Sequence, residues 1–387
     1  MKNAAALGFW SAVLLTLTSI GGCQRSDPVN ENLLQLDQGA FEVTGPYLHE
    51  NMTVFLLHSN EQDDREFITL DQGLKDGVVK VSEQNRAQVN QLEINNESDQ
   101  YLFLQEGDRV VGGQQDRIII TSLVIPPKSG NMSLPSFCVE QGRWHGQKGF
   151  GAGANSALAP KDVRQASKVV NQQPAVWEKV RDVKRTANMT QAVNAPNTNT
   201  SLNETLESPQ VQKMSDECAK ALENILDDHP RAVGVVVAIN GAIEEINIYP
   251  NHKVLCSQYP RLLKSYALQA AIEEKTGEEK PEMSVADVRA FMSERKEQAE
   301  TQKREVNSDN LLYVCPASDK TECQTVYGGK VVHRQWLGNN EAIAKQDAPA
   351  PQDGSRGQRS APNQPPINDV DNAPRQAPQP PAQPPKQ

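Results

Sequence analysis

Hydrophobic positions follow two different patterns along the chain. Up to about residue 150, short apolar runs such as residues 52–57 alternate with turn residues, which is typical of strands. Beyond residue 160, apolar residues recur three and four positions apart, as in Val211, Met214 and Cys218, which predicts helices. We therefore expect an α+β fold: a β-rich, sandwich-like N-terminal half followed by a mixed helix and hairpin half.

Three local signals fix elements within the second half. Asn240-Gly241 joins two apolar runs and favours the positive φ angles of a two-residue hairpin turn. Ser208-Pro209 predicts a helix start, with serine as N-cap and proline in the first turn. Ser284 followed by Asp287 matches a variant of the capping box and predicts a second helix start.

Two dense polar phrases stand out, at residues 105–117 and 138–145, on either side of the apolar run 118–125. The run is short and β-branched and ends at a proline pair, so it predicts one buried strand. Both phrases would then lie against that strand and meet in space, where a fixed backbone would hold their side chains. This juxtaposition is the candidate site.

The N-terminus resembles a secretion leader over residues 1–22, ending in the lipobox-like sequence Ile20-Gly21-Gly22-Cys23. Cys23 is accordingly the predicted lipidation site, and an ordinary cleaved leader is the alternative. A polar tether (23–37), a folded region (38–337) and a Pro/Gln-rich tail (346–387) follow. The folded region divides into a β-rich part (38–150) and a mixed part (160–337), and the tail is predicted to be disordered because it has almost no aliphatic residues.

The amino-acid composition limits the classes of partner that we expect the protein to bind. The formal charge of −10 argues against nucleic acid, which requires a basic surface. We expect export across the inner membrane and attachment to the cell envelope through lipidated Cys23, facing the periplasm or the exterior, with palmitate as the added acyl chain. Disulfides form in such a compartment. Cys315 and Cys323 flank a turn-like segment and are the disulfide candidate, with buried thiols as the alternative.

The two phrases, with residues 234–241 and 262–267, carry a family resemblance. In this order they resemble the bacterial ARG-and-rhodanese-phosphatase-superfamily-associated protein domain, over about residues 38–337. The family name implies genomic association with ADP-ribosylglycohydrolases and phosphatase-like proteins. The resemblance assigns neither an activity nor a site residue.

The chemistry of the phrases allows two interpretations. Glu106 and Glu140 are the catalytic candidates, as an acid/base pair. The ligand-binding candidates are Gln115, Arg117, Glu140, Arg143 and Trp144. Ion pairing between neighbouring strands is the structural alternative for the same acids and arginines. No cysteine or histidine pair has metal-ligand spacing, and no cofactor is predicted.

We therefore expect an envelope-associated lipoprotein that binds an unassigned ligand or protein. The alternative is a hydrolase acting on phosphate- or ribose-containing substrates of the ADP-ribose type, using Glu106 and Glu140. The sequence alone does not decide whether the protein is an enzyme.

Overall fold

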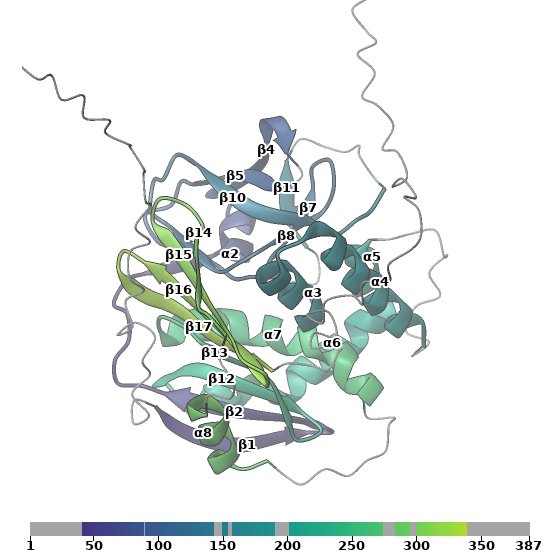
Figure 1. The fold of residues 1–387 in the computed structure, drawn as a ribbon, viewed down its shortest axis with the longest axis vertical. Helices are drawn as coiled ribbons and strands as arrows, with labels where there is room; N and C mark the ends of the chain where they lie inside the picture. Colours follow the sequence, from purple (N-terminus) through teal and green to yellow (C-terminus); the bar gives the residue numbers. More distant parts are fainter. Residues whose placement is uncertain are drawn as a thin grey trace, which may run out of the picture.

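The computed structural model describes residues 41–88, 90–142, 149–153, 157–189, 201–273, 283–294 and 299–338. Its largest element is an eight-stranded antiparallel sheet in the order β1-β2-β12-β13-β17-β16-β15-β14 (Figure 1). These strands are β1 (Glu42–His49), β2 (Met52–His58), β12 (Ala232–Ile239), β13 (Ala242–Ile248), β14 (Gln302–Glu305), β15 (Asn310–Pro316), β16 (Lys320–Tyr327) and β17 (Lys330–Gly338). Strands β1 and β2 thus join a sheet otherwise built from the second half of the chain.

Two smaller sheets lie beside the large one (Figure 1). A six-stranded sheet has the order β11-β7-β8-β10-β5-β4, and a three-stranded sheet has the order β3-β6-β9, with β3 parallel to β6. The strands are β3 (Phe67–Thr69), β4 (Val79–Gln88), β5 (Gln91–Asn96), β6 (Tyr101–Leu104), β7 (Arg109–Gly112), β8 (Arg117–Ile119), β9 (Leu123–Ile125), β10 (Asn131–Cys138) and β11 (Phe150–Ala152).

The apolar run 118–125 does not form the single strand that its composition predicts. It divides into β8 and β9, which belong to different sheets. The break spans residues 120–122, where the backbone leaves strand geometry: the Ser122 hydroxyl bonds to Glu106, and its carbonyl accepts a hydrogen bond from Thr325 at 3.1 Å. Polar contacts to two distant segments therefore override the β-propensity of the run.

Helices cover both faces of the large sheet (Figure 1). On one face, α6 and α7 pack against alternate residues of β12, including Val235 and Val237. On the other face, α8 packs against Val236, Ala238 and Trp336. The helices are α2 (Leu70–Lys75), α3 (Lys161–Gln165) with the π-helical turn η1 (Ala166–Val170), α4 (Gln173–Met189), α5 (Leu202–Leu206), α6 (Pro209–Leu222) with the 3-10 turn η2 (Glu223–Leu226), α7 (His252–Glu273) and α8 (Val285–Ser293).

The local signals read from the sequence are confirmed. Asn240 and Gly241 have φ angles of 48° and 70° and connect β12 to β13 as a two-residue turn. Helix α6 begins with Ser208 as N-cap and proline in its first turn, and α8 begins with a complete capping box between Ser284 and Asp287. The α+β class is likewise confirmed.

At Cys315 and Cys323 the structure has buried thiols, which is the alternative to the candidate disulfide. Cys315 and Cys323 lie on the two strands of the β15–β16 hairpin, but no bond joins them. Cys323 faces Val314, whereas Cys315 faces Glu322, so the two side chains point to opposite sides of the sheet. Burial raises the pKa of the Cys323 thiol to about 12, which leaves it an unreactive core side chain.

Candidate functional site

The two polar phrases do meet, through backbone pairing and through the side chains of Gln115 and Arg117. Arg117 on β8 pairs with Cys138 on β10, and the Val139 N–H donates to the Asp116 carbonyl at 3.0 Å. The Gln115 amide donates to the Glu140 carbonyl at 2.8 Å. Arg143 and Trp144 lie outside the described residues, so the meeting involves residues up to 142 of the second phrase.

Arg117 and Cys138 occupy a closed interior. The Arg117 side chain is 0% exposed, contacts the Cys138 sulfur and lies 3.6 Å from a Glu83 carboxylate oxygen. Burial raises the pKa of Cys138 to about 11, so the thiol stays protonated at neutral pH. The arginine is thus bound within the protein, and the cysteine lacks the depressed pKa of a nucleophile.

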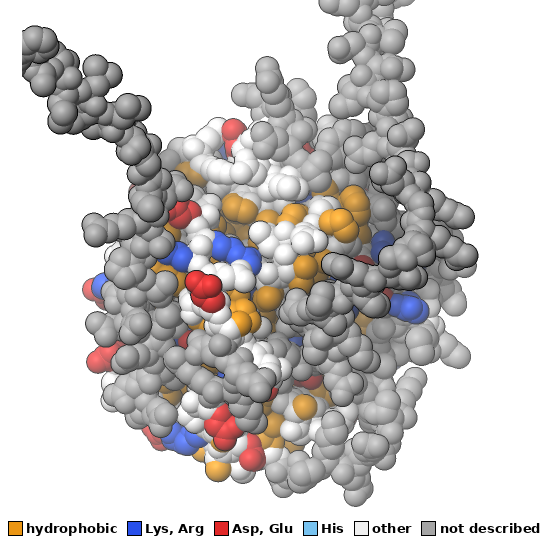
Figure 2. Space-filling view, in the orientation of Figure 1, with side chains coloured by type: hydrophobic (Ala, Val, Ile, Leu, Met, Phe, Trp, Pro, Cys, Tyr) orange, Lys and Arg blue, Asp and Glu red, His pale blue; other side chains and the backbone are white. Residues whose placement is uncertain are grey.

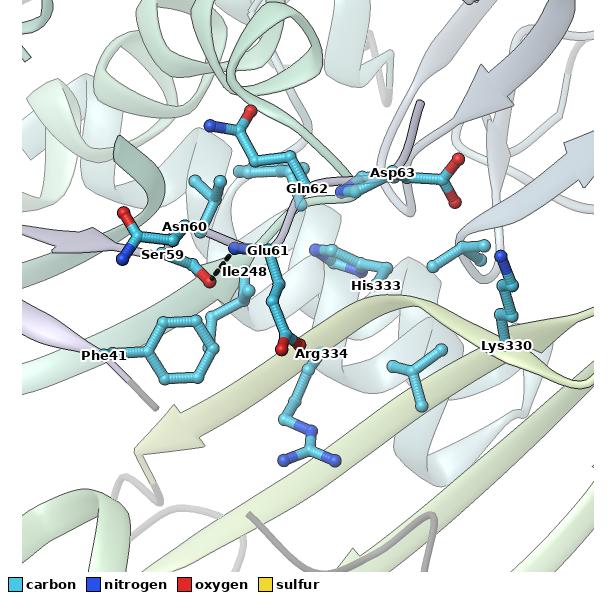
Figure 3. A pocket seen from close by; sticks show the side chains of 15 residues that line it. Phe41, Ser59, Asn60, Glu61, Gln62, Asp63, Ile248, Lys330, His333 and Arg334 are labelled. Carbon is cyan, nitrogen blue, oxygen red and sulfur yellow. Dashed lines mark hydrogen bonds between the residues drawn. The ribbon is translucent and has the colours of Figure 1, made fainter. Parts of the chain in front are cut away.

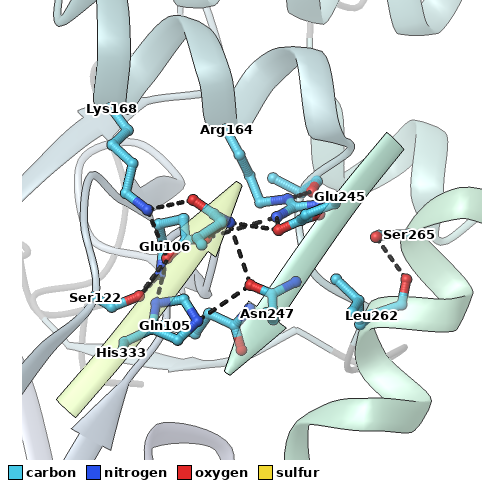
Figure 4. A network of polar contacts seen from close by, with 12 residues as sticks. Gln105, Glu106, Ser122, Arg164, Lys168, Glu245, Asn247, Leu262, Ser265 and His333 are labelled. Atoms are coloured by element: carbon cyan, nitrogen blue, oxygen red, sulfur yellow. Dashed lines mark hydrogen bonds and ion pairs between the residues drawn. The ribbon is translucent and has the colours of Figure 1, made fainter. Parts of the chain in front are cut away.

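The two candidate catalytic acids serve different parts of the structure. Glu140 follows β10 and forms an isolated bridge with Ser201, next to α5. Glu106 follows β6 and points instead into a polar network between α3–η1 and the large sheet (Figure 4). Glu106 is 1% exposed and Glu140 is 8% exposed. Neither acid lines either of the cavities described below.

Three cationic or imidazole groups surround the Glu106 carboxylate. Lys168 Nζ lies 3.3 Å from it, Arg164 Nη1 3.7 Å and His333 Nδ1 3.7 Å. The Ser122 hydroxyl and the Gln335 amide also donate to it. The carboxylate is therefore held as an anion without any contact to solvent.

A second buried acid completes the network. Arg164 donates to both carboxylate oxygens of Glu245, at 2.7 and 2.6 Å, and the Tyr266 hydroxyl donates to the same group at 2.5 Å. The Gln335 amide bridges Glu106 and Glu245, while its oxygen accepts from Lys168 at 2.5 Å. Two acids thus face two bases in one charge-balanced cluster.

The pKa shifts follow from this arrangement. Burial alone would raise the pKa of Glu106, but Lys168, His333 and Arg164 outweigh it and lower the pKa to about 2. Burial lowers the pKa of His333 to about 4, against the attraction of Glu106. At neutral pH the network therefore contains an ionised Glu106 and a neutral His333.

The basic residues of this network were not predicted from the sequence. Lys161, Arg164 and Lys168 recur at i, i+3 and i+7 and share one side of α3–η1. All three are buried; Lys161 pairs with Glu244 at 2.5 Å, next to the Arg164–Glu245 pair. The available signal was two adjacent glutamates inside an otherwise apolar strand, since such acids require cations from a neighbouring element.

The rest of the first phrase is also enclosed. Asp108 pairs with Arg261 at 2.6 Å, while Arg109 donates to the Ala157 carbonyl at 3.0 Å and to Asn203 at 2.5 Å. The cavity beside Arg109 and Arg261 measures about 10 Å³. That volume holds at most about one water molecule, so this corner cannot take a substrate.

A much larger cavity opens elsewhere, where β13 ends and β17 begins beside the segment 59–63 (Figure 3). Its volume is about 660 Å³, within the range of roughly 300–1,000 Å³ usual for small-molecule sites. Polar and charged groups come from Ser59, Asn60, Glu61, Gln62, Asp63, Lys330, His333 and Arg334, and the other lining residues are Phe41, Val233, Ile248, Tyr249, Pro250, Val331 and Val332.

The base of this cavity touches the buried network. His333 and Tyr249 are stacked with ring centroids 5.2 Å apart. His333 bonds to Asn247 at 3.1 Å, and the Tyr249 hydroxyl donates to Gln105 at 3.1 Å. The network therefore supports the floor of the cavity from behind. None of these cavity residues belongs to the two polar phrases from which the sequence predicts a site.

The described residues contain no group of three or more histidine, cysteine or acidic side chains able to hold a metal ion. Within the same residues, no helix combines the length and apolar character needed to cross a bilayer. On the face seen in Figure 2, acidic and basic side chains are interspersed.

The fold and site define an α+β domain with an internal ionic network and an open polar cavity. The chain matches the ARG and Rhodanese-Phosphatase-superfamily-associated Protein domain over residues 40–337, and it belongs to this family. Comparison with curated proteins and with solved structures gave no match.

Proposed function

We propose that the protein is an envelope-anchored binding module that captures a small ligand without converting it. The observation that carries this proposal is the open cavity of about 660 Å³ at the end of β13 and the beginning of β17. Eight of its fifteen lining residues carry polar or charged side chains and the others supply apolar or aromatic surface, so the cavity offers both kinds of contact to a ligand.

The hydrolase alternative receives less support. A general acid must reach the substrate and must have a pKa near the working pH. Glu106 is enclosed by Lys168, Arg164 and His333, and its pKa lies at about 2. Glu140 is buried and bridges Ser201 at the start of α5, and neither acid lines the large cavity.

The anchor is the second part of the proposal. Cys23 and the leader lie outside the described residues, so the lipobox-like sequence supports the anchor by itself. A diacylglyceryl group on Cys23 would tether the domain to the membrane through residues 24–40. The cavity would then face the periplasm or the exterior, where it meets exported small molecules.

Two measurements on the purified mature protein test the function. One is a ligand screen by thermal shift and calorimetry, in which a binding module gains stability from its ligand. The other is a turnover screen on phosphate esters and ADP-ribose-type substrates, with Glu140→Gln as the matched variant. Turnover by the wild type that Glu140→Gln loses would replace the binding module by the hydrolase.

A further inference from the structure

The cavity presents two exposed charges of opposite sign that form no direct ion pair with another described residue. Glu61 and Lys330 both line it and are both exposed. Among the described residues, neither forms an ion pair within 4.0 Å, although Lys330 lies near enough to Asp63 to help lower the pKa of that carboxyl. In Figure 3, Glu61 extends from its loop toward β17, and Lys330 stands across the view from Phe41. The two charges are thus available to a ligand.

The other charged groups of the cavity already have protein partners. Asp63 accepts hydrogen bonds from Arg65 Nε at 2.8 and 3.0 Å. Arg334 lies 3.8 Å from Glu322 and its guanidinium is 5.9 Å from the Trp336 ring centroid. Glu61 and Lys330 therefore set the charge pattern that an entering ligand meets.

We infer that the cavity selects a zwitterion of the amino-acid or short-peptide class. Glu61 receives the ammonium group, and Lys330 receives the carboxylate. The inference rests on the binding function proposed above and names its ligand class.

The remaining walls suit such a molecule. Val331, Val332 and Ile248 give the cavity an apolar side, which accepts an aliphatic side chain between the two charged ends. Asn60 and Gln62 add amide groups that can pair with a peptide bond. A ligand with a charge at each end and an apolar middle would therefore contact a charged residue at each end and apolar residues between them.

The loop that carries Glu61 is held in place before any ligand arrives. The Ser59 N–H donates to the Arg231 carbonyl at 3.0 Å, and the Asp63 N–H donates to the Pro250 carbonyl at 2.8 Å. The Ser59 hydroxyl accepts from the Glu61 N–H at 3.0 Å, and Gln62 accepts from the His252 N–H at 2.8 Å. Such preorganisation lowers the entropy lost on binding.

The test is calorimetric titration of the mature protein with alanine–leucine peptides of two to four residues. Each peptide is used unmodified, N-acetylated and C-amidated, and a neutral oligosaccharide serves as a further probe. We expect one unmodified length to bind, and blocking either end to weaken it by about tenfold, as for a hydrogen bond to a charged group.

Variants assign each end of the peptide. In Glu61→Gln, N-acetylation should no longer change affinity, whereas C-amidation should still weaken binding. In Lys330→Met, C-amidation should no longer change affinity, whereas N-acetylation should still weaken binding. Glu217→Gln and Lys213→Met, on the exposed side of α6 at 66% and 77% side-chain exposure, are the charge-matched controls and should behave as wild type.

The outcomes separate this inference from the function on which it rests. Binding of the oligosaccharide alone, or peptide binding insensitive to both end blocks, overturns the zwitterion and leaves the binding module intact. Blocking effects that persist unchanged in Glu61→Gln and Lys330→Met also overturn it. Absence of any binding, together with turnover lost in Glu140→Gln, overturns both.

Discussion

Glu106 is the most informative residue to change, because its charge balances the buried network. Coulomb's law with an effective dielectric constant of about 20 gives an attraction of about 5 kcal/mol for the 3.3 Å separation from Lys168. Glu106→Gln removes that attraction and leaves one excess positive charge among Lys168, Arg164 and Glu245. Breaking a buried pair in this way costs about 3–5 kcal/mol of unfolding free energy.

The partner substitution reveals the coupling. Lys168→Met alone leaves an excess negative charge and should cost a similar amount. The double variant restores neutrality, so its loss should be smaller than the sum of the two single losses by at least about 2 kcal/mol. Urea unfolding followed by circular dichroism measures the three values, with Lys213→Met as an exposed control. Losses that add within about 0.5 kcal/mol would refute a coupled network.

Three further predictions concern acid stability, the anchor and the thiols. Burial lowers the pKa of His333 from 6.5 to about 4, so between these pH values the unfolded chain binds more protons than the folded protein. The free energy of unfolding should therefore fall by up to about 3 kcal/mol as the pH is lowered from 6.5 to 4. In urea titrations His333→Gln should remove that part of the pH dependence, and an unchanged dependence would contradict the prediction. Cys23→Ser should move the protein from the membrane fraction to the soluble fraction, and unchanged fractionation would refute lipidation. Cys256 is exposed, while burial raises the pKa of Cys138 to about 11; iodoacetamide at pH 7.5 should therefore label Cys256 first by mass spectrometry, and equal labelling would indicate an open interior at Cys138.

Local chemistry predicted the elements well, because each signal acts within a few residues. The Asn240-Gly241 turn and the Ser284 capping box depend only on backbone angles and adjacent hydrogen bonds. The same local signals do not predict which strands pair when they are far apart in the sequence. Nothing in the composition of β2 indicates that it pairs with β12, some 180 residues later, and the division of residues 118–125 depends on distant contacts of Ser122.

The candidate site shows the same division. Residues 105–117 do lie next to residues 138–142 as expected, but through the pairing of β8 with β10 and not against one shared strand over residues 118–125. It did not predict that Arg117 would be 0% exposed, because an arginine in a polar phrase ordinarily reaches solvent. The sequence does not predict the cavity, because its lining comes from five separate segments that carry no motif and are brought together only by the sheet.

One titration series tests directly whether the large cavity is the ligand site. The best ligand from the screen is titrated into wild type, Glu61→Trp and Glu140→Gln. Because an indole in place of the Glu61 carboxylate fills part of the cavity while keeping the backbone of the loop, the account predicts that Glu61→Trp loses affinity at least about tenfold and Glu140→Gln keeps it. Loss of affinity in Glu140→Gln, with normal binding by Glu61→Trp, would contradict the account.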